Sequence, residues 1–454
     1  MTRCALPSPG PAGTGASMRR GACPSLASPM QTGDGLLVRL RPATDGLTPM
    51  EIEALAAAAA ACGNGIIEIT ARGNLQIRGL TASTVQALAA AIGEAGIAIA
   101  EGVAIETPPL AGIDPDEIAD PRPLARALSA QIACAQPTLR LAPKLSIVID
   151  GGGRFHLGDV AADLRLSALD GPDGARWLLS VGGTARSARP IALLEAEECV
   201  SAVMEILAEL CALAPAARGR DLDADRLRLR WYPGAALPAA TESVPPLPAG
   251  IHHFGAAGVV LGLGLAFAQA EAAGLAAFVR QAQELGAREM RLAPRHGLFV
   301  LGLSGETAAL AQRLAASYGF LVAADDRRNP IATCAGLACA SALMDTKATA
   351  RLLVEAAPDL LDGSLAMHLS GCGKGCARPA ASPLTLVGAP SGYALVVNGT
   401  ASVAPSAYRD DNGIRSALAA LGALVRENKD AGESALSCLT RLGTARIAQA
   451  FEQE

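Results

Sequence analysis

Residues 63–80, GNGIIEITARGNLQIRGL, contain two short strand-like segments on either side of a tight turn. Ile66–Thr70 is short and rich in β-branched residues, whereas Asn74–Gly79 alternates polar and apolar side chains. Both patterns are typical of strands, and Gly73 marks the turn between them. Because side chains alternate across a strand, the second segment has one polar face and one apolar face.

The flanking sequence completes a recognisable order of elements. Gly35–Arg41 predicts a strand, Thr48–Ala61 predicts a helix, and Thr81–Ala95 predicts a closing helix. Thr48 and Glu51 have the spacing of a capping box at the start of the first helix. Strand, helix, strand, strand, helix is the order of half a ferredoxin-like α+β unit.

The same order occurs a second time in the chain. A shift of 223 positions (258 − 35) aligns Gly35–Leu40 (GLLVRL) with Gly258–Leu263 (GVVLGL) without a gap. At the same offset Gly63 meets Gly286, and Leu75 meets Leu298. One offset held over this distance indicates an internal duplication. We therefore predict two ferredoxin-like halves that form a pseudo-twofold unit.

An α/β segment follows each half. In the first segment we predict strands at Leu145–Ile149 and Trp177–Val181, and helices at Leu124–Ala133 and Leu193–Leu213. WLLSVGG at Trp177 resembles YALVVNG at Tyr393, so the two α/β segments are a second, weaker pair of repeats. The predicted fold is mixed α+β and α/β, with two ferredoxin-like half-domains and two α/β domains. The predicted boundaries are 1–34 for a disordered extension and lead-in, 35–112 for the first half, 113–232 for the first α/β domain, 233–250 for a Pro/Ala-rich linker, 251–326 for the second half and 327–454 for the second α/β domain.

Composition excludes several classes of protein. The 454 residues carry a net charge of −5, and no run of Lys and Arg forms a nucleic-acid patch. The apolar runs are too short for a membrane span. Eleven cysteines, an odd number, occur without an export signal. This favours a cytoplasmic protein whose thiols are reduced and available as metal ligands.

Two cysteine pairs stand out. HLSGCGKGCARP (residues 368–379) holds Cys372 and Cys376, and TCAGLACAS holds Cys334 and Cys339. Four thiols in two short pairs are the ligand set of a [4Fe–4S] cluster. The adjacent glycines allow the sharp turns and the N–H donors that such a cluster needs. A structural zinc site is the alternative, but zinc ribbons usually have Cys-x2-Cys pairs.

Cations and amides gather on the strands of the first half. These candidate anion-binding residues are Arg39, Arg41, Arg72, Asn74, Gln76 and Arg78. In the second copy the counterparts of Arg39, Arg41, Gln76 and Arg78 are Gly262, Gly264, Phe299 and Leu301. Only Arg72 keeps a cationic counterpart, Arg295. This asymmetry predicts one anionic ligand per chain, bound through guanidinium groups. The alternative is a solvated face of a half-exposed sheet.

Lys144, which precedes a predicted strand, is a further candidate for the same site. His252, His253, His296 and His368 lie near predicted strand or loop ends. A histidine can bind iron, but none pairs with another ligand at a recognisable spacing. We therefore expect ordinary hydrogen-bonded histidines.

Three motifs resemble the sulfite/nitrite reductase iron–sulfur family. SGCGKGCARP resembles its second cysteine motif, although the first pair here is Cys-x4-Cys and in the family is usually Cys-x5-Cys. TARGNLQIRG is similar to the first strand that contacts the tetrapyrrole, and APKLS is similar to the strand with two catalytic lysines. Only the first lysine is present, as Lys144, and Ser146 takes the second position. The resemblance implies a cluster next to a tetrapyrrole, which is sirohaem in the reductases.

The opening RRGACPSLASPMQTGDGLLVR closely resembles the precorrin-3B synthase branch of this family. The resemblance implies an O2-dependent monooxygenase of cobalamin biosynthesis that hydroxylates precorrin-3A at C20 and closes a γ-lactone. It also implies a [4Fe–4S] cluster, a mononuclear non-haem iron whose ligands are not assigned, and NADH as the ultimate reductant. A G-x-G-x-x-G fingerprint is absent, so we expect a separate NADH-dependent reductase as electron donor.

The resemblance assigns roles to the candidate residues. Lys144 and Arg72 are expected to be catalytic. The substrate carboxylates are expected to bind Arg39, Arg41, Arg72, Asn74, Gln76, Arg78, Lys144 and Arg295. Two alternatives stay open: a sirohaem-dependent sulfite or nitrite reductase, and a non-catalytic scaffold that docks an acidic protein.

Overall fold

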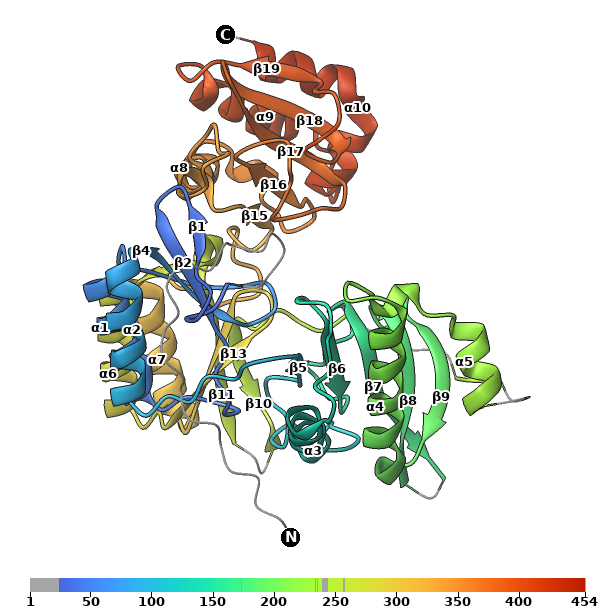
Figure 1. Ribbon diagram of the computed structural model, residues 1–454. Helices are drawn as coiled ribbons and strands as arrows, with labels where there is room; N and C mark the ends of the chain where they lie inside the picture. The colour runs from blue at the N-terminus through green and yellow to red at the C-terminus, as the bar shows by residue number, and fades with distance from the viewer. Residues whose placement is uncertain are drawn as a thin grey trace.

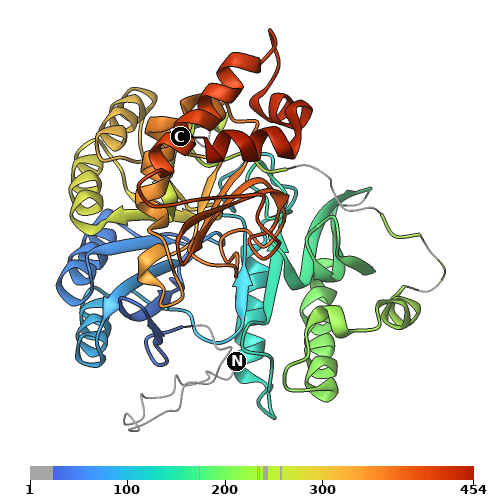
Figure 2. The ribbon, with the colours of Figure 1, turned by 90° about the horizontal axis from the view of Figure 1, so that it is seen from above.

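The computed structural model describes residues 24–453 except 173, 233, 235, 239–243 and 256–257. The chain forms three bodies (Figure 1). The two ferredoxin-like halves lie together, the first α/β segment lies beside them, and the C-terminal segment lies above. Figure 2, the view from above, shows the C-terminal segment in front of the ferredoxin-like halves, with the first α/β segment to one side.

The first half has the predicted element order. Its elements are β1 (Met30–Thr32), β2 (Gly35–Leu40), α1 (Pro49–Cys62), β3 (Ile66–Ile69), β4 (Leu75–Leu80) and α2 (Ala82–Glu94). The predicted capping box is confirmed: the Thr48 hydroxyl accepts the Glu51 N–H at 3.3 Å, and the Glu51 carboxylate accepts the Thr48 N–H at 2.7 Å. The N-terminal extension to residue 23 lies outside the described residues. In the rest of the lead-in, β1 pairs with β2.

The second half repeats the order at the predicted offset. Its elements are β10 (Gly250–His253), β11 (Val259–Gly264), η3 (Ala266–Ala268), β12 (Gln269–Glu271), α6 (Ala272–Glu284), β13 (Glu289–Ala293), β14 (Gly297–Leu301) and α7 (Gly305–Ser317). The two strands that the sequence analysis did not predict, β10 and β12, pair with β11 and β3 respectively.

Each half contributes a short segment that pairs with the edge strand of the other half. Ala270 of β12 lies opposite Ile67 of β3, and Leu47 forms a bridge to Met290 of β13. The two pairs are equivalent by the repeat, since 47 + 223 = 270 and 67 + 223 = 290. Buried side chains of both halves form one hydrophobic core. The predicted pseudo-twofold unit is therefore confirmed at the level of single residue pairs.

The first α/β segment is a five-stranded sheet with helices. Its elements are β5 (Ala104–Glu106), α3 (Arg122–Cys134), β6 (Ser146–Asp150), β7 (Ala162–Gly171), β8 (Gly174–Gly183), β9 (Arg189–Leu194), α4 (Ala196–Leu213), η1 (Gly219–Asp221) and α5 (Ala224–Trp231). Two boundaries differ from prediction. β5 lies within the range 35–112 but pairs with β6 of this sheet. The helix predicted to begin at Leu193 begins at Ala196, because Leu193 and Leu194 pair with β8.

The C-terminal segment has the same sheet. Its elements are β15 (Ile331–Thr333), η4 (Gly336–Ala338), α8 (Thr346–Ala356), η5 (Pro358–Leu360), β16 (Met367–Ser370), β17 (Ser382–Ala389), β18 (Gly392–Gly399), β19 (Ala407–Arg409), α9 (Ile414–Asn428) and α10 (Ala435–Glu452). Both sheets run in sequence order, with two parallel pairings followed by two antiparallel pairings. The weak likeness around Trp177 and Tyr393 therefore falls on equivalent strands, β8 and β18.

Among the residues that the structure describes, no helix combines the length and the apolar character needed to cross a bilayer.

Candidate functional site

Both cysteine pairs lie at one edge of the C-terminal sheet. Cys334 directly follows β15, and Cys372 and Cys376 follow β16. β15 and β16 are parallel, with Thr333 beside Leu369, so their carboxyl ends meet at the same edge. Cys339 follows the short helix η4 in the same loop as Cys334. The sheet therefore brings together the two pairs that are more than thirty positions apart.

The backbone around the thiols has the features expected of a cluster cradle. The Cys334 sulfur accepts N–H groups from Gly371 at 3.1 Å and from Gly336 at 3.4 Å. Gly336 and Gly375 adopt φ of 58° and 62°, which favour glycine. Burial and the neighbouring thiols of Cys372, Cys334 and Cys339 together raise the pKa of Cys376. Four thiols close enough to influence one another, with N–H donors at sulfur, fit a [4Fe–4S] cluster.

A site for a single metal ion needs several ligating side chains that reach the same point. Within the described ranges, no three His, Cys, Asp or Glu side chains lie close enough to hold one ion. In a four-cysteine cluster each thiolate binds a different iron atom, so the thiols stand further apart than the ligands of one ion. No ligand set for a mononuclear iron is visible in this part of the chain.

The predicted polar face is present on β2, β3 and β4. Arg39 lies opposite Gln76, and Gln76 lies opposite Glu68. Arg39 donates to the side-chain amide oxygen of Gln76 at 2.9 Å, and the Gln76 amide nitrogen donates to the Glu68 carboxylate. Gln76 and Arg78 are 8% and 4% exposed, so a solvated face is the wrong description of these two residues.

Arg78 connects this face to the loop that carries Cys334 and Cys339. Its guanidinium donates twice to the Asp34 carboxylate, at 3.1 Å each, and lies 3.6 Å from Glu68. It also donates to the Ala338 carbonyl at 2.7 Å, one residue before Cys339. The Gly33 N–H donates to the same carbonyl at 3.1 Å. Arg78 therefore holds the loop between Cys334 and Cys339 against the first half, through contacts within the protein.

Lys347 makes a similar connection to the second half. Its ammonium group donates to the Thr333 hydroxyl at 2.7 Å and to the Phe267 carbonyl. Phe267 has φ of 57°, so this bond supports a left-handed turn. Burial lowers the pKa of Lys347 to about 8. The residue links β15, which leads into Cys334, to the loop before β12.

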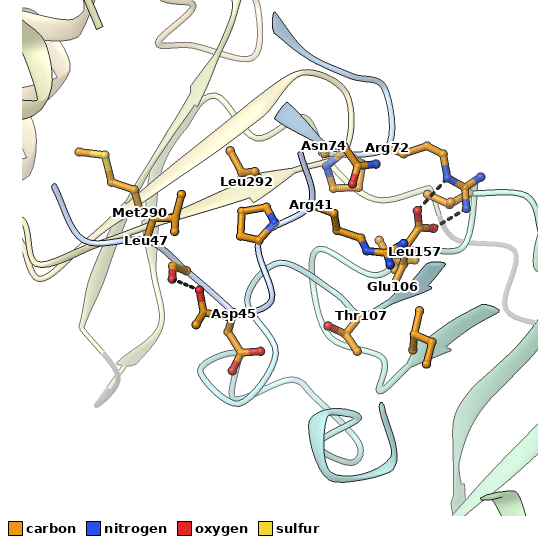
Figure 3. Close-up of a pocket in the computed structure, with 17 residues that line it drawn as sticks. Arg41, Asp45, Leu47, Arg72, Asn74, Glu106, Thr107, Leu157, Met290 and Leu292 are labelled. Carbon is orange, nitrogen blue, oxygen red and sulfur yellow. Dashed lines mark hydrogen bonds and ion pairs between the residues drawn. The ribbon is translucent and has the colours of Figure 1, made fainter. Parts of the chain in front are cut away.

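A cavity of about 120 Å³ lies between the ferredoxin-like halves and the first α/β segment (Figure 3). Arg72, Asn74, Arg41 and Glu106 line it together with apolar residues such as Met290. Small-molecule sites usually measure about 300–1,000 Å³, so this cavity is too small for a tetrapyrrole ring. It is large enough for one side chain of such a ring.

Arg72 is a partly exposed cation at this cavity. It forms a bidentate ion pair with Glu106, visible in Figure 3, and donates to the Ala161 carbonyl at 2.7 Å. These bonds use three of the five N–H donors of a guanidinium. The side chain is 35% exposed. Counting only bonds to described residues, two N–H groups remain for an anionic ligand.

The remaining candidates of this group lie at neighbouring positions. Arg41 donates to the carbonyls of Glu101 and Val103, both at 3.2 Å. Lys144 is exposed in the turn before β6. β6 and β7 are parallel, so Lys144 lies at the same end of the sheet as Ala161, which binds Arg72. The structure thus groups Arg41, Arg72 and Asn74 around the cavity, and it places Lys144 at the nearby end of the sheet.

In the second half, the sheet face that corresponds to the polar face of β2, β3 and β4 is filled by neighbouring residues. A Cβ atom at Gly262 would overlap the Pro248 carbonyl oxygen, and a Cβ atom at Gly297 would lie 2.5 Å from the Pro248 ring. Phe299 packs edge-on against Phe155, at 4.8 Å between ring centroids. The described residues of the predicted linker therefore seal this face. Arg295 lies beside it, paired with Asp159 and bonded to the Pro245 carbonyl at 3.0 Å.

The histidines differ from one another. His252 bonds the Pro248 carbonyl at 2.7 Å and His296 bonds the Ile69 carbonyl at 2.6 Å, so the prediction of ordinary hydrogen-bonded histidines is confirmed for both. His368 is wholly buried, and neither ring nitrogen has a hydrogen-bond partner among the described residues. Burial, with a smaller effect of Arg378, lowers its pKa to about 4.

Four charged residues of the site were missed in the sequence. They are Asp34, Glu68, Glu106 and Lys347. A signal existed for Glu68: the turn at Thr70–Asn74 places residues 68 and 76 opposite each other, as observed. Lys347 had no local signal, since its partner Phe267 is 80 positions away.

Known proteins resemble this chain at three levels. Residues 28–95 match the profile of the nitrite/sulfite reductase ferredoxin-like half domain. The structure of the Mycobacterium tuberculosis NirA protein superposes with a TM-score of 0.69, over 91% of this chain and 84% of that one. Its sequence identity is 16%, so this likeness supports the fold.

The third comparison covers the whole chain. A curated precorrin-3B synthase from Sinorhizobium sp is 63% identical over 456 aligned positions, which span 100% of this chain and 99% of the relative. Identity at this level, along the full length of both proteins, extends the resemblance from single motifs to every segment described above. The chain belongs to the precorrin-3B synthase family.

Proposed function

We propose that this chain is an O2-dependent monooxygenase that hydroxylates precorrin-3A at C20 and forms the γ-lactone of precorrin-3B. The observation that carries the proposal is the 63% identity to a precorrin-3B synthase over the full length. The reductase-like fold is consistent with it, since that fold serves tetrapyrrole chemistry in the family that the sequence motifs resemble.

The reaction defines what the protein must provide. One oxygen atom of O2 enters the product, and the other leaves as water with two electrons and two protons. A [4Fe–4S] cluster on Cys334, Cys339, Cys372 and Cys376 would supply electrons one at a time. The mononuclear iron has no proposed ligands. NADH is proposed as the ultimate source of electrons, through a separate reductase.

The substrate is an anion with many carboxylates, and the accessible cations lie where they can orient it. We assign Arg72 to one carboxylate, because its bonds to Glu106 and Ala161 leave two of its five N–H groups for a ligand. Asn74 and Arg41 line the same cavity, and Lys144 lies at the adjoining end of the sheet. Gln76 and Arg78 are occupied by internal bonds, and Arg39 donates to Gln76, which gives the three a role in holding the site together.

The sirohaem-dependent reductase is the less favoured candidate. Ser146 occupies the position of the second catalytic lysine in the reductase motif. Ser146 is 6% exposed, and its N–H donates to the Asp163 carboxylate at 2.9 Å. A protonating lysine is therefore replaced by a buried residue, which suits a reaction that has no sulfite to protonate.

The test begins with anaerobically purified full-length protein. We expect iron and acid-labile sulfide, a broad iron–sulfur absorbance, and no sirohaem bands. Incubation with precorrin-3A, O2 and a reducing system should then give a product that is heavier by one oxygen atom, labelled when ¹⁸O2 is used. Sirohaem bands together with sulfite or nitrite reduction would overturn the proposal, as would a product whose new oxygen comes from water.

A further inference from the structure

His368 is a buried polar residue whose partner is missing from the protein. It lies in the middle of β16 with an exposed fraction of 0%. Its neighbours Met367 and Leu369 belong to the hydrophobic core of the C-terminal segment. Because side chains alternate along a strand, His368 points to the opposite face of the sheet. Both ring nitrogens are buried without a hydrogen-bond partner in the described chain.

The loop that carries Cys372 and Cys376 covers this imidazole. A Cβ atom built on Gly375 would lie 3.6 Å from the His368 Cε1 atom and 3.3 Å from the Ala401 Cβ atom. Gly375 has φ of 62°, so the loop turns directly above the ring. His368 is therefore packed against the segment between two proposed cluster ligands.

A second unpartnered donor follows the same loop, and its charge acts on His368. The Nε atom of Arg378, two residues after Cys376, is buried and also lacks a partner among the described residues. Folded proteins satisfy nearly all buried polar groups, and an unsatisfied one is strongly unfavourable. One such group beneath this loop and another just after it indicate an acceptor that belongs to a bound group rather than to the polypeptide.

We infer that His368 donates an N–H hydrogen bond to a sulfur atom at the Cys372–Cys376 side of the cluster. This inference rests on the cluster assignment in the proposed function. Cluster sulfurs are acceptors, and hydrogen bonds to them help to set the reduction potential. The bond is stronger when the cluster is reduced and more negative, so it raises the potential. His368 is thus a positioning residue that favours acceptance of an electron.

The experiment uses the full-length holoprotein, with iron and sulfide measured first. Protein labelled with ¹⁵N-histidine is reduced and examined by pulsed EPR. We expect a weak ¹⁵N coupling to the cluster, which disappears in His368→Leu. The midpoint potential of His368→Leu should be lower than that of the wild type. His368→Asn and His368→Gln place an amide N–H near either ring nitrogen, and one of them should restore the potential.

The control is His253→Leu, since His253 is exposed on β10. Its potential should equal that of the wild type. An unchanged potential in His368→Leu at full iron and sulfide content would overturn the inference. If His368→Leu loses the cluster, the EPR spectrum of the ¹⁵N-labelled wild type tests the inference instead. A spectrum without ¹⁵N coupling would refute the hydrogen bond, and so would the strong coupling of a nitrogen bound directly to iron. Wild-type protein without iron and sulfide would instead reject the cluster assignment itself.

Discussion

Arg72 and Arg295 are 223 positions apart and make the same three bonds. Each donates through Nε and Nη2 to one carboxylate, Glu106 or Asp159, and through Nη1 to one backbone carbonyl. Their side chains are 35% and 31% exposed. Their carboxylate partners differ in burial, since Glu106 is 12% and Asp159 40% exposed. The surface beside them also differs, being open next to Arg72 and filled by Pro248 next to Arg295.

This pair provides a matched test of the substrate site. Arg72→Leu should weaken precorrin-3A binding by roughly 10- to 100-fold, because hydrogen bonds to charged groups contribute about 1.5–3 kcal/mol. Arg295→Leu breaks the corresponding, more exposed ion pair of the second half and should leave binding unchanged. Equilibrium fluorescence titration with precorrin-3A in the absence of O2 measures both. Equal weakening in the two variants would contradict a single site per chain.

The contacts of Arg78 predict that its replacement lowers the stability of the protein. Arg78→Leu leaves the carboxylates of Asp34 and Glu68 without their cation and releases the Ala338 carbonyl next to Cys339. Removing one partner of a buried ion pair typically costs about 3–5 kcal/mol. We expect a lower denaturation midpoint by calorimetry and a reduced iron content.

The control for this variant is Arg280→Leu, which breaks an exposed ion pair with Glu53 between α6 and α1. Exposed pairs contribute little, so its midpoint and iron content should match the wild type. Full iron content in Arg78→Leu would show that the loop that carries Cys334 and Cys339 does not depend on Arg78.

The sealed face of the second half predicts that Gly262 cannot carry a side chain. Gly262→Ala would push a methyl group into the Pro248 carbonyl and should destabilise the protein by about 1–3 kcal/mol. Gly93→Ala, in an exposed turn of α2 with no atom within 4 Å, should stabilise it by about 0.5–1 kcal/mol. Chemical denaturation followed by circular dichroism compares the two. A neutral Gly262→Ala would mean that the linker moves away easily.

We expect the partly buried carboxyl group of Glu117 to make the stability of the protein depend on pH. Its carboxylate accepts the Gly112 N–H at 2.8 Å, while its other oxygen is buried without a partner among the described residues. Burial raises its pKa from 4.5 to about 7. Between these values the folded chain keeps a proton that the unfolded chain releases, so stability falls as the pH rises.

Glu117→Gln removes this titration. It should lose less stability than the wild type between pH 4.5 and pH 7, by on the order of 1 kcal/mol, a figure reduced because the side chain is partly exposed. Thermal denaturation at a series of pH values measures the difference. Parallel curves for the two proteins would show that Glu117 does not titrate in this range.

The fold could be predicted where the signal was local or repeated. Thr48 and Glu51 are three positions apart, so the start of α1 was readable. The constant offset predicted the halves, and the same offset relates the bridge at Leu47 to the pairing of Ala270. The strand β12 was missed because its three residues are defined by pairing with β3 of the other half.

The site was harder to predict because its contacts join distant segments. The sequence indicated which cations share a strand face, and Arg39 and Gln76 do lie opposite each other. It did not indicate that Arg78 reaches Ala338, 260 positions away, or that Asp34 and Glu68 neutralise it. A pattern of charges on one strand predicts a polar face, but the partners of those charges depend on tertiary structure.

The reciprocal pairing of β12 with β3 and of Leu47 with Met290 also bears on how the chain arose. A half on its own would leave its edge strand, β3 or β13, without a partner on one side, and open edges tend to pair with another chain. Two identical halves would close both edges at once across a twofold axis, as isologous dimers do. A gene that encoded one half would thus yield a symmetric dimer with two equal faces. Fusion of the two copies would then allow linker prolines such as Pro248 to fill the face of the second half, while the face of the first half kept its arginines.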